Sequence, residues 1–389
     1  MHQKRLAVVT THPIQYYAPV FQHLAKQDLT LRVFYTWGKE SVQKYDPDFH
    51  RVIEWDVPLL EGYDFVFLRN TSTRPGTHHF KGIINPSAVQ AIEQFRPDAI
   101  LVYGWSWHSH LKILRHFSGK LPVWFRGDST LLDPQPHLKK LIRKVLLTWV
   151  YRHIDLAFYV GSHNKRYFSA FGLKEKQLFF SPHSIDNVRF ANSMPAKAKD
   201  YRNKWGLSDS SILILFAGKL EPKKDPMALL QAFEELENPH VFLVFVGNGI
   251  LENTLKEKAR QSAKSRQIFF LDFQNQLSMP AIYQNCDLYC LPSVGPGETW
   301  GLAVNEAMAS GKAVLVSDKV GCAPDLVEVG VNGEVFRAGD RQNLLEKLTM
   351  LTKNRQGLER MGEASAKLIQ KWSFQEQINS ILAHVNQLA

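Results

Sequence analysis

Two glutamates near one loop-to-helix junction are well suited to hold vicinal hydroxyl groups. Glu298 and Glu306 lie in the segment PSVGPGETWGLAVNEAMA, residues 292–309. A carboxylate accepts two hydrogen bonds at once, which suits the paired hydroxyls of a sugar or a ribose. Gly301 lets the backbone approach a ligand closely, and the helix that follows offers unpaired N–H groups at its start. Either glutamate alone is as readily a helix cap or a surface residue, so the hypothesis rests on the assembled segment.

A cluster of lysines follows an earlier apolar run. Lys219, Lys223 and Lys224 lie in AGKLEPKKD, and their ammonium groups could hold a diphosphate on a strand-to-helix turn. A solvated basic loop is the competing interpretation. The run Gly247-Asn248-Gly249 follows the next apolar run and is weak evidence by itself.

Alternating strand and helix patterns must position these residues. In the first half the expected strands are 5–10, 30–36, 64–68, 98–103, 121–125 and 155–160, with helices at 86–95 and 137–154. In the second half the expected strands are 212–217, 241–246, 268–271, 287–291, 313–316 and 334–336, with a helix at 226–236 and a helical stretch at 341–388 that is broken at 372–374. This alternation predicts two mostly parallel sheets. The polar run 192–211 is interpreted as the linker between them. Ligands bind beyond the carboxyl ends of parallel strands, where the glutamate and lysine loops fall.

In combination, these segments resemble the retaining glycosyltransferase family numbered four, which has the GT-B architecture. Glu298 and Glu306 are separated by seven residues, as in that family's central motif. Lys219 and Lys224 resemble its phosphate-binding pair, and VGNG resembles its glycine pair. The stretches SPHSIDNVRF and VGCAPDLVEVGVNGEVF also match, and the resemblance covers residues 155–380.

The resemblance implies an α/β fold of GT-B type, with two Rossmann-like, doubly wound domains facing a cleft. We expect an acceptor-binding domain over 1–192 and a nucleotide-sugar-binding domain over 193–370. The C-terminal helix, 371–389, is expected to cross back to the first domain.

The resemblance also implies a role for each donor-site residue. Glu298 should hold the donor sugar, Glu306 the ribose, and Lys219 with Lys224 the leaving diphosphate. The expected donor site comprises Gly218, Lys219, Lys224, Gly247, Asn248, Glu298, Thr299, Trp300, Gly301, Leu302 and Glu306. We expect no metal and no cofactor, with the nucleotide-sugar as co-substrate, because lysines and helix dipoles can stabilise the leaving group.

The N-terminal half departs from the family pattern. The loop THPIQYYAPVF has no glycine, and His12 lies in it; in PVWFRGDST, Arg126 stands where many members place a histidine. An arginine cannot act as a base, but it could stabilise negative charge or orient an anionic acceptor. Asp128 or a donor phosphate oxygen could take the acceptor proton. The catalytic candidates are therefore Glu298, Arg126, Asp128 and His12, while His108 is either a second cleft histidine or a structural one.

Positive charge is concentrated in the first half of the chain. Residues 1–190 hold 25 Lys and Arg against 15 Asp and Glu, whereas residues 191–389 hold 22 of each. A basic face suits anionic lipid, phosphorylated acceptors or nucleic acid, and nucleic acid is not the partner we expect. The expected helix 137–154 is basic and amphipathic, so its apolar stripe belongs either in the domain core or on a membrane.

Length and composition agree with a soluble two-domain enzyme. The chain has 389 residues, and its three cysteines give no even disulfide framework. The apolar run 6–9 is too short for a signal peptide, and no stretch approaches the ~20 apolar residues of a membrane span. We therefore expect a cytoplasmic protein that is either free in solution or peripheral on the inner face of the cell membrane.

The resemblance and the basic half together suggest the reaction. The expected activity moves a hexose-type sugar from a UDP- or GDP-sugar to a hydroxyl of a cell-envelope glycan or lipid-linked acceptor. Two alternatives stay open: a sugar-nucleotide 2-epimerase of the same fold, and a basic, non-enzymatic protein that binds membrane or nucleic acid. The glutamate pair in the charge-balanced half argues against the second.

Overall fold

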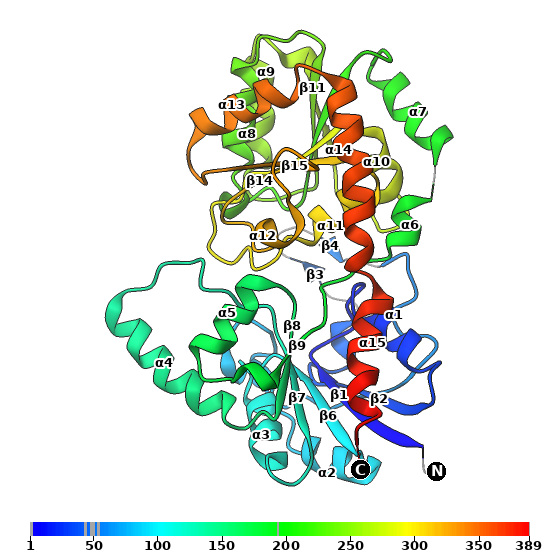
Figure 1. The fold of residues 1–389 in the computed structure, drawn as a ribbon, viewed down its shortest axis with the longest axis vertical. Helices are drawn as coiled ribbons and strands as arrows, with labels where there is room; N and C mark the ends of the chain where they lie inside the picture. The colour runs from blue at the N-terminus through cyan, green and yellow to red at the C-terminus, as the bar shows by residue number, and fades with distance from the viewer. Residues whose placement is uncertain (1–2, 43–44, 47–50, 53–54, 193, 389) are drawn as a thin grey trace. The chain divides into compact units, whose positions relative to one another are not determined.

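The chain folds into two compact units in this computed structural model, which describes residues 3–42, 45–46, 51–52, 55–192 and 194–388 (Figure 1). The first unit holds residues 1–44, 52–183 and 374–389, and the second holds 45–51 and 184–373. Apart from residues 45–51, which group with the second unit, the chain passes from the first unit to the second at 183–184 and returns at 373–374. Within the described residues, no helix is long and apolar enough to span a membrane.

The first unit is built on a parallel sheet. Its strands are β1 (Lys4–Thr10), β2 (Leu29–Tyr35), β5 (Asp64–Phe67), β6 (Ala99–Tyr103), β7 (Val123–Arg126), β8 (Leu156–Tyr159) and β9 (Leu178–Phe180). Their order is β5-β2-β1-β6-β7-β8-β9, and every neighbouring pair is parallel. The short strands β3 (Tyr45–Asp46) and β4 (Arg51–Val52) form a separate sheet. The apolar interior of β1 is buried throughout, as expected for a strand covered on both faces.

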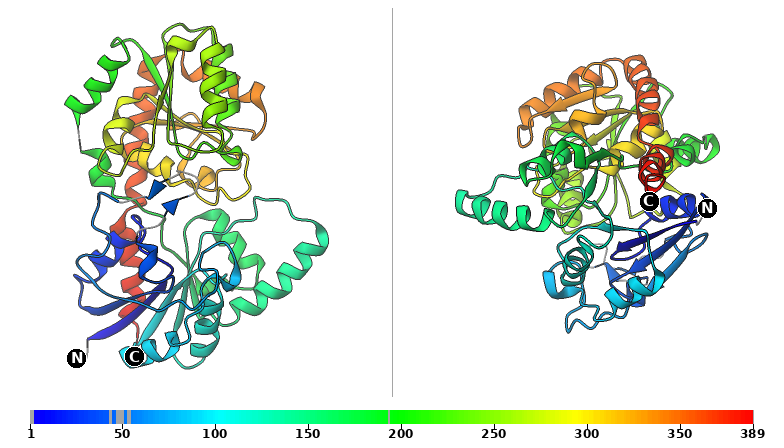
Figure 2. Two further views of the ribbon diagram at one scale, coloured as in Figure 1. Left: turned by 180° about the vertical axis from the view of Figure 1, so that it is seen from behind. Right: turned by 60° about the horizontal axis from the view of Figure 1, so that its bottom comes forward.

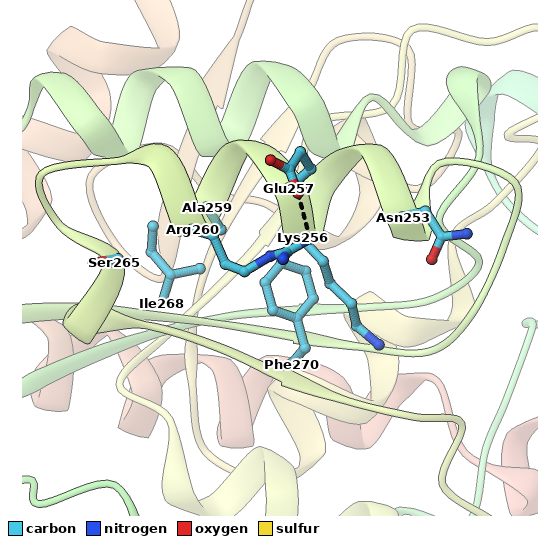
Figure 3. A pocket seen from close by; sticks show the side chains of 8 residues that line it. All are labelled: Asn253, Lys256, Glu257, Ala259, Arg260, Ser265, Ile268 and Phe270. Carbon is cyan, nitrogen blue, oxygen red and sulfur yellow. Dashed lines mark hydrogen bonds and ion pairs between the residues drawn. The ribbon is translucent and has the colours of Figure 1, made fainter.

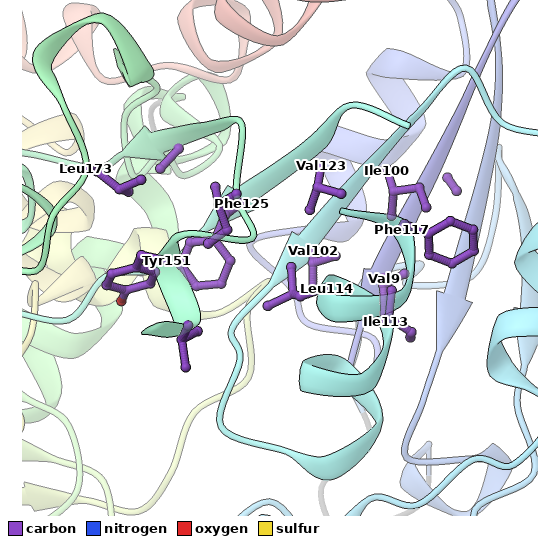
Figure 4. Close-up of a cluster of buried hydrophobic side chains, with 14 of the residues drawn as sticks. Val9, Ile100, Val102, Ile113, Leu114, Phe117, Val123, Phe125, Tyr151 and Leu173 are labelled. Carbon is purple, nitrogen blue, oxygen red and sulfur yellow. The ribbon is translucent and has the colours of Figure 1, made fainter. Parts of the chain in front are cut away.

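Helices cover both faces of this sheet. They are α1 (Ala18–Leu24), α2 (Ala88–Phe95), α3 (His108–Phe117), α4 (His137–Tyr151), α5 (Ser162–Ala170) and α15 (Phe374–Val385). On one face, Ile113 and Phe117 of α3 pack in a cluster with Val102 of β6 (Figure 4). On the other face, Ile378 and Ile381 of α15 share a core with the residues of β1 and α1. This apolar stripe explains why the last helix belongs to the first unit.

The second unit repeats the design. Its strands are β10 (Ile212–Ala217), β11 (Val241–Val246), β12 (Ile268–Leu271), β13 (Leu288–Leu291), β14 (Ala313–Ser317) and β15 (Gly333–Phe336). Its helices are α6 (Asn187–Ala191), α7 (Pro195–Lys204), α8 (Pro226–Glu235), α9 (Glu252–Gln261), α10 (Met279–Asn285), α11 (Leu302–Ala309), α12 (Ala323–Leu326), α13 (Arg341–Leu351) and α14 (Arg355–Leu368). The strand order is β12-β11-β10-β13-β14-β15, all parallel, so the order reverses between β10 and β13. A reversal of this kind is where doubly wound sheets bind ligands.

Two sequence-based expectations need correction. The run 192–211 is not a bare linker: it contains α7 and belongs to the second unit, where the Arg202 guanidinium lies 3.7 Å from the Asp287 carboxylate. The sequence hid this helix because it has no apolar stripe. Nor does the apolar stripe of α4 lie in the core along its whole length, since only Leu147, Val150 and Tyr151 of that helix are buried.

Candidate functional site

The loops that follow β10 and β13 meet at the point where the strand order of the second unit reverses. The backbone N–H of Val294 donates to the carbonyl of Lys223 at 2.8 Å, which ties the two loops together. Because β10 and β13 are parallel neighbours, both loops leave the same edge of the sheet. This adjacency brings together two motifs that lie far apart in the sequence.

Lys224 and Glu298 form an ion pair across these loops. The Nζ of Lys224 lies 2.6 Å from Oε2 of Glu298, and Ser293 Oγ donates to the same oxygen at 2.9 Å. The two side chains are only 16% and 10% exposed, so solvent screens the pair weakly. A cation and a carboxylate are thus held side by side at the expected ligand edge.

Glycines let the backbone pack closely beneath this pair. Gly247 has φ +128°, and a Cβ there would lie 2.2 Å from the carbonyl oxygen of Gly218. Only glycine fits such a contact, because real Cβ atoms do not approach backbone that closely. The stem of Lys224 in turn passes over Gly218, whose added Cβ would meet Lys224 Cδ at 3.3 Å. The glycine pair and the lysine loop therefore form one structural unit.

Glu306 is buried on α11, where it accepts a hydrogen bond from a tyrosine. The phenol of Tyr283, on α10, donates to Oε2 of Glu306 at 2.9 Å, and Glu306 is 4% exposed. Nearby, the pKa of Tyr289 is raised well above its usual value, first by burial and then by the negative charges of Glu298 and Glu306. The negative charge of both glutamates therefore disfavours ionisation of one tyrosine of β13.

The start of α11 has the geometry expected of a hydroxyl- or phosphate-binding helix end. Gly301 precedes the helix with φ +97°, a conformation that favours glycine, and Leu302 is the first helical residue. Thr299 and Trp300 lead into it, and the indole N–H of Trp300 is fixed by Asn305 Oδ1 at 2.8 Å. Within the first turn the N–H of Val304 donates to the carbonyl of Gly301 at 2.9 Å, and helix N-termini in general direct N–H groups toward a ligand at their open end.

Two other expected donor residues have different surroundings. The amide of Asn248 joins its own loop to the loop after β12: its Oδ1 accepts from the N–H of Phe273 at 2.8 Å, and its Nδ2 donates to Glu252 at 3.0 Å and to Asp272 at 3.2 Å. These contacts favour a loop-shaping use of the side chain. Lys219 is half-buried at the end of β10.

In the first unit, the side chain of Arg126 is buried against the residues where the chain leaves the domain and does not project into solvent. Its guanidinium is buried and donates to the carbonyls of Ser181 and Pro182 at 2.7 and 2.8 Å. Arg126 therefore fixes the backbone of Ser181 and Pro182, the first two residues of the stretch SPHSIDNVRF. The end of the same stretch is fixed within the second unit, because the Arg189 guanidinium donates to the carbonyl and the side-chain oxygen of Gln276 at 2.9 and 2.8 Å. These contacts give Arg126 a positioning use that the sequence did not predict.

Asp128 lies beside a histidine that the sequence argument did not single out. His183 Nε2 is 3.8 Å from Asp128 Oδ2, and the His183 ring stacks on Tyr17 at a centroid distance of 6.4 Å. Burial lowers the pKa of His183 and Arg126 lowers it further, whereas Asp128 opposes both effects. His183 follows the end of β9, so its place after a strand was the signal that could have identified it.

Three histidines in or near the candidate segments have different surroundings: one lies in a loop, one is exposed and one is buried. His12 is half-buried in the loop after β1, with Nδ1 2.8 Å from Thr11 Oγ1. His108 is exposed at the start of α3. His110 is buried: its Nδ1 faces the carbonyls of Tyr103 and Gly104 at 3.1 and 3.0 Å, and burial lowers its pKa to about 4. In the stretch GWSWHSH, the structural histidine is therefore His110.

A separate hollow lies along α9 and β12 in the second unit, with a volume of about 560 Å³ (Figure 3). It is lined by Asn253, Lys256, Glu257, Ala259, Arg260, Ser265, Ile268 and Phe270. None of these is an expected donor-site residue. The described residues contain no group of three or more His, Cys, Asp or Glu side chains placed to hold a metal ion.

The two doubly wound parallel sheets define an α/β fold of GT-B type. HepE of Anabaena, solved with UDP and glucose, is similar in structure, with a TM-score of 0.72 over 99% of this chain and 100% of that one. The sequence identity is 17%, so the likeness concerns the fold alone.

Sequence comparison points to the same class of protein. Residues 197–368 match the family described as Glycosyl transferases group 1. An uncharacterized glycosyltransferase of Methanocaldococcus jannaschii is 32% identical over 34% of this chain and 34% of its own length. A GDP-mannose-dependent monoacylated phosphatidylinositol monomannoside mannosyltransferase of Corynebacterium glutamicum is 26% identical over 59% of this chain and 62% of its own. The chain thus spans less than two thirds of these relatives, and together the matches support a glycosyltransferase.

Proposed function

We propose that the protein transfers a hexose-type sugar from a UDP- or GDP-sugar to a hydroxyl of a cell-envelope glycan or lipid-linked acceptor. The observation that carries this proposal is the Lys224–Glu298 pair where the strand order reverses, with Glu306 buried on the helix that follows. The relative from Corynebacterium is named for a GDP-sugar donor and a lipid acceptor, and HepE was solved with UDP and glucose. The two names differ in the nucleobase of the nucleotide, so the proposal includes both UDP- and GDP-sugars as donors.

Each group has a task that suits its chemistry. Glu298 binds hydroxyls of the donor sugar, and Glu306 binds the ribose. During transfer the bond between the anomeric carbon and the diphosphate breaks, while a bond to the acceptor oxygen forms on the same face of the sugar. Lys224, Lys219 and the start of α11 stabilise the negative charge that develops on the leaving diphosphate. The acceptor proton passes to a phosphate oxygen or to Asp128.

We further propose that the reaction needs no metal ion, because ammonium groups and helix N–H groups supply the positive charge. Activity should then persist in EDTA at the level measured with magnesium or manganese. Complete loss in chelator, restored by a divalent cation, would overturn this part of the proposal while leaving donor binding intact.

A ligand screen tests the main proposal directly. The protein is heated in the presence of UDP, GDP and their common sugar conjugates, and the midpoint of unfolding is recorded. A ligand at 100 times its dissociation constant stabilises the folded state by roughly 2.7 kcal/mol, a readily measured shift. The ligand that shifts the midpoint is then offered as donor, and release of the nucleoside diphosphate is followed. If no nucleotide shifts the midpoint, the donor-site assignment is wrong.

A further inference from the structure

The first turns of α4 carry an exposed apolar face. Leu138, Leu141, Ile142 and Val145 are spaced at i, i+3, i+4 and i+7, so they lie on one side of the helix. Leu138 is 70% exposed and Val145 is 66% exposed, although both are large apolar side chains. Figures 1 and 2 show α4 standing off from the rest of its domain at the end of a long loop. Four such residues in one stripe form a contiguous patch rather than scattered surface positions.

Toward the end of the helix Trp149 continues this face and packs against the domain core, whereas the four exposed residues precede that contact. The buried residues of the helix are Leu147, Val150 and Tyr151, which lie at i, i+3 and i+4 and define the opposite side. Arg143 belongs to that packed side, because its guanidinium donates to the Tyr167 hydroxyl at 3.2 Å. The helix thus has one face committed to the domain, and the opposite apolar face is turned outward over its first turns.

The charges around the outward face are all positive. Lys139, Lys140 and Lys144 are exposed, and α4 contains no acidic residue. Lys139 and Lys144 flank the apolar stripe, where their long stems can extend past apolar surface to anions at its edge. A lipid bilayer with anionic headgroups offers this combination of an apolar interior and a negatively charged rim.

We propose that α4 is an interfacial helix that inserts Leu138, Leu141, Ile142 and Val145 into an anionic lipid bilayer. Charge complementarity selects this occupant over a second copy of the chain. A symmetric dimer through α4 would place the same lysine-rich edges against one another. The proposal concerns a surface distinct from the donor site, so its tests need neither nucleotide nor acceptor.

Cosedimentation with vesicles tests the charge and the apolar face separately. The full chain should bind vesicles of phosphatidylcholine and phosphatidylglycerol in equal parts, and binding to pure phosphatidylcholine should be at least about tenfold weaker. Replacing Lys139 and Lys144 with Gln should weaken binding to anionic vesicles roughly twentyfold, and added salt should mimic that change. Replacing Leu141 and Val145 with Gln should weaken it at least about tenfold at any salt concentration.

Matched controls on the second unit show that the location matters. Ile250 is 68% exposed, and Lys258 is exposed on α9. Changing each to Gln removes an exposed apolar or basic side chain of the same kind from elsewhere on the chain. Neither change should alter vesicle binding, and an equal loss in these controls would overturn the assignment to α4.

A labelled cysteine reports whether the helix enters the bilayer. The native cysteines are buried, and burial raises the pKa of the Cys286 thiol, so one introduced at position 145 reacts selectively with a polarity-sensitive fluorophore. Val145→Cys should show a blue-shifted emission on anionic vesicles. Lys140→Cys, on the opposite side of the helix, should remain in an aqueous environment.

Two results would overturn the proposal. An unchanged emission at position 145 on vesicles that bind the protein would mean that another surface makes the contact. A blue shift that needs no vesicles and grows with protein concentration would identify a second copy of the chain as the occupant.

Discussion

The ammonium group of Lys224 lies 2.6 Å from Oε2 of Glu298, so one charge pair joins the loops that follow two neighbouring strands. In the proposed reaction the lysine binds diphosphate and the glutamate binds sugar, and each therefore influences what the other can bind. The pair makes the two halves of the donor site energetically dependent on each other.

Substitutions at this pair should affect nucleotide and sugar differently. Lys224→Met removes a charge-assisted contact worth roughly 1.5–3 kcal/mol, so affinity for the nucleoside diphosphate should fall at least about tenfold. Glu298→Gln leaves Lys224 free to bind phosphate, so diphosphate affinity should hold or rise while sugar transfer falls. Calorimetry with UDP or GDP, together with a turnover assay, measures both effects. Lys347→Met is the matched control, because Lys347 pairs with Glu334 at 2.7 Å in the same domain.

Glu306→Ala should reduce donor affinity by about ten- to a hundredfold, because it removes a charged acceptor from the ribose. Tyr283→Phe should cause a smaller loss, since it removes only the hydrogen bond that orients the carboxylate. Isothermal titration gives both affinities, and circular dichroism checks the fold. Glu334→Gln, at another buried glutamate, should leave affinity unchanged. Normal donor affinity in a folded Glu306→Ala protein would exclude the ribose role.

A substitution of Arg126 distinguishes two roles for this residue: positioning the backbone of Ser181 and Pro182, or contacting the acceptor. Arg126→Lys cannot reproduce the paired bonds to the carbonyls of Ser181 and Pro182, so the unfolding free energy should fall by about 1–3 kcal/mol. Below the unfolding temperature, KM for the acceptor should change little. Arg115→Lys, at an exposed arginine, is the control. A raised acceptor KM with unchanged stability would instead show that Arg126 contacts the acceptor.

Stability should depend on pH through His110. Burial lowers the pKa of His110 from 6.5 to about 4. Between these values the unfolded chain takes up a proton that the folded chain does not, so stability falls as pH falls through this window. The loss should reach roughly 2 kcal/mol at pH 5 relative to pH 7.5. Melting curves of His110→Asn should depend less on pH, whereas those of His116→Gln, on the surface, should follow the parent protein. Equal slopes for both variants would contradict the assignment.

The sequence by itself determined the elements and the edge of the sheet at which chemistry-bearing residues gather. Continuous apolar runs such as Ile212–Ala217 and Val241–Val246 predicted buried parallel strands, and the structure has strands at those bounds. Glu298 and Lys224 follow strand ends in the sequence, and a parallel sheet places such loops on one side. Local pattern suffices here because backbone periodicity and burial are properties of short segments.

Tertiary structure decided which of those loops are neighbours and what each buried side chain contacts. The pairing of Lys224 with Glu298 depends on β10 lying beside β13, and strand order is not encoded in any short pattern. The burial of Arg126 against Ser181 and Pro182 likewise depends on contacts distant in the sequence.

The helix α4 is a second case in which the sequence predicts the element but not its contacts. Its sequence specifies an amphipathic helix but does not say which side the domain will bury. Leu147 and Leu138 are chemically identical, yet the first is buried and the second is exposed. The packing of Leu147, Val150 and Tyr151, with Trp149 beside them, fixes the rotation of the helix, and that rotation leaves the apolar face of the first turns exposed. Burial is a property of the assembled domain, because it depends on what surrounds a residue rather than on the residue itself.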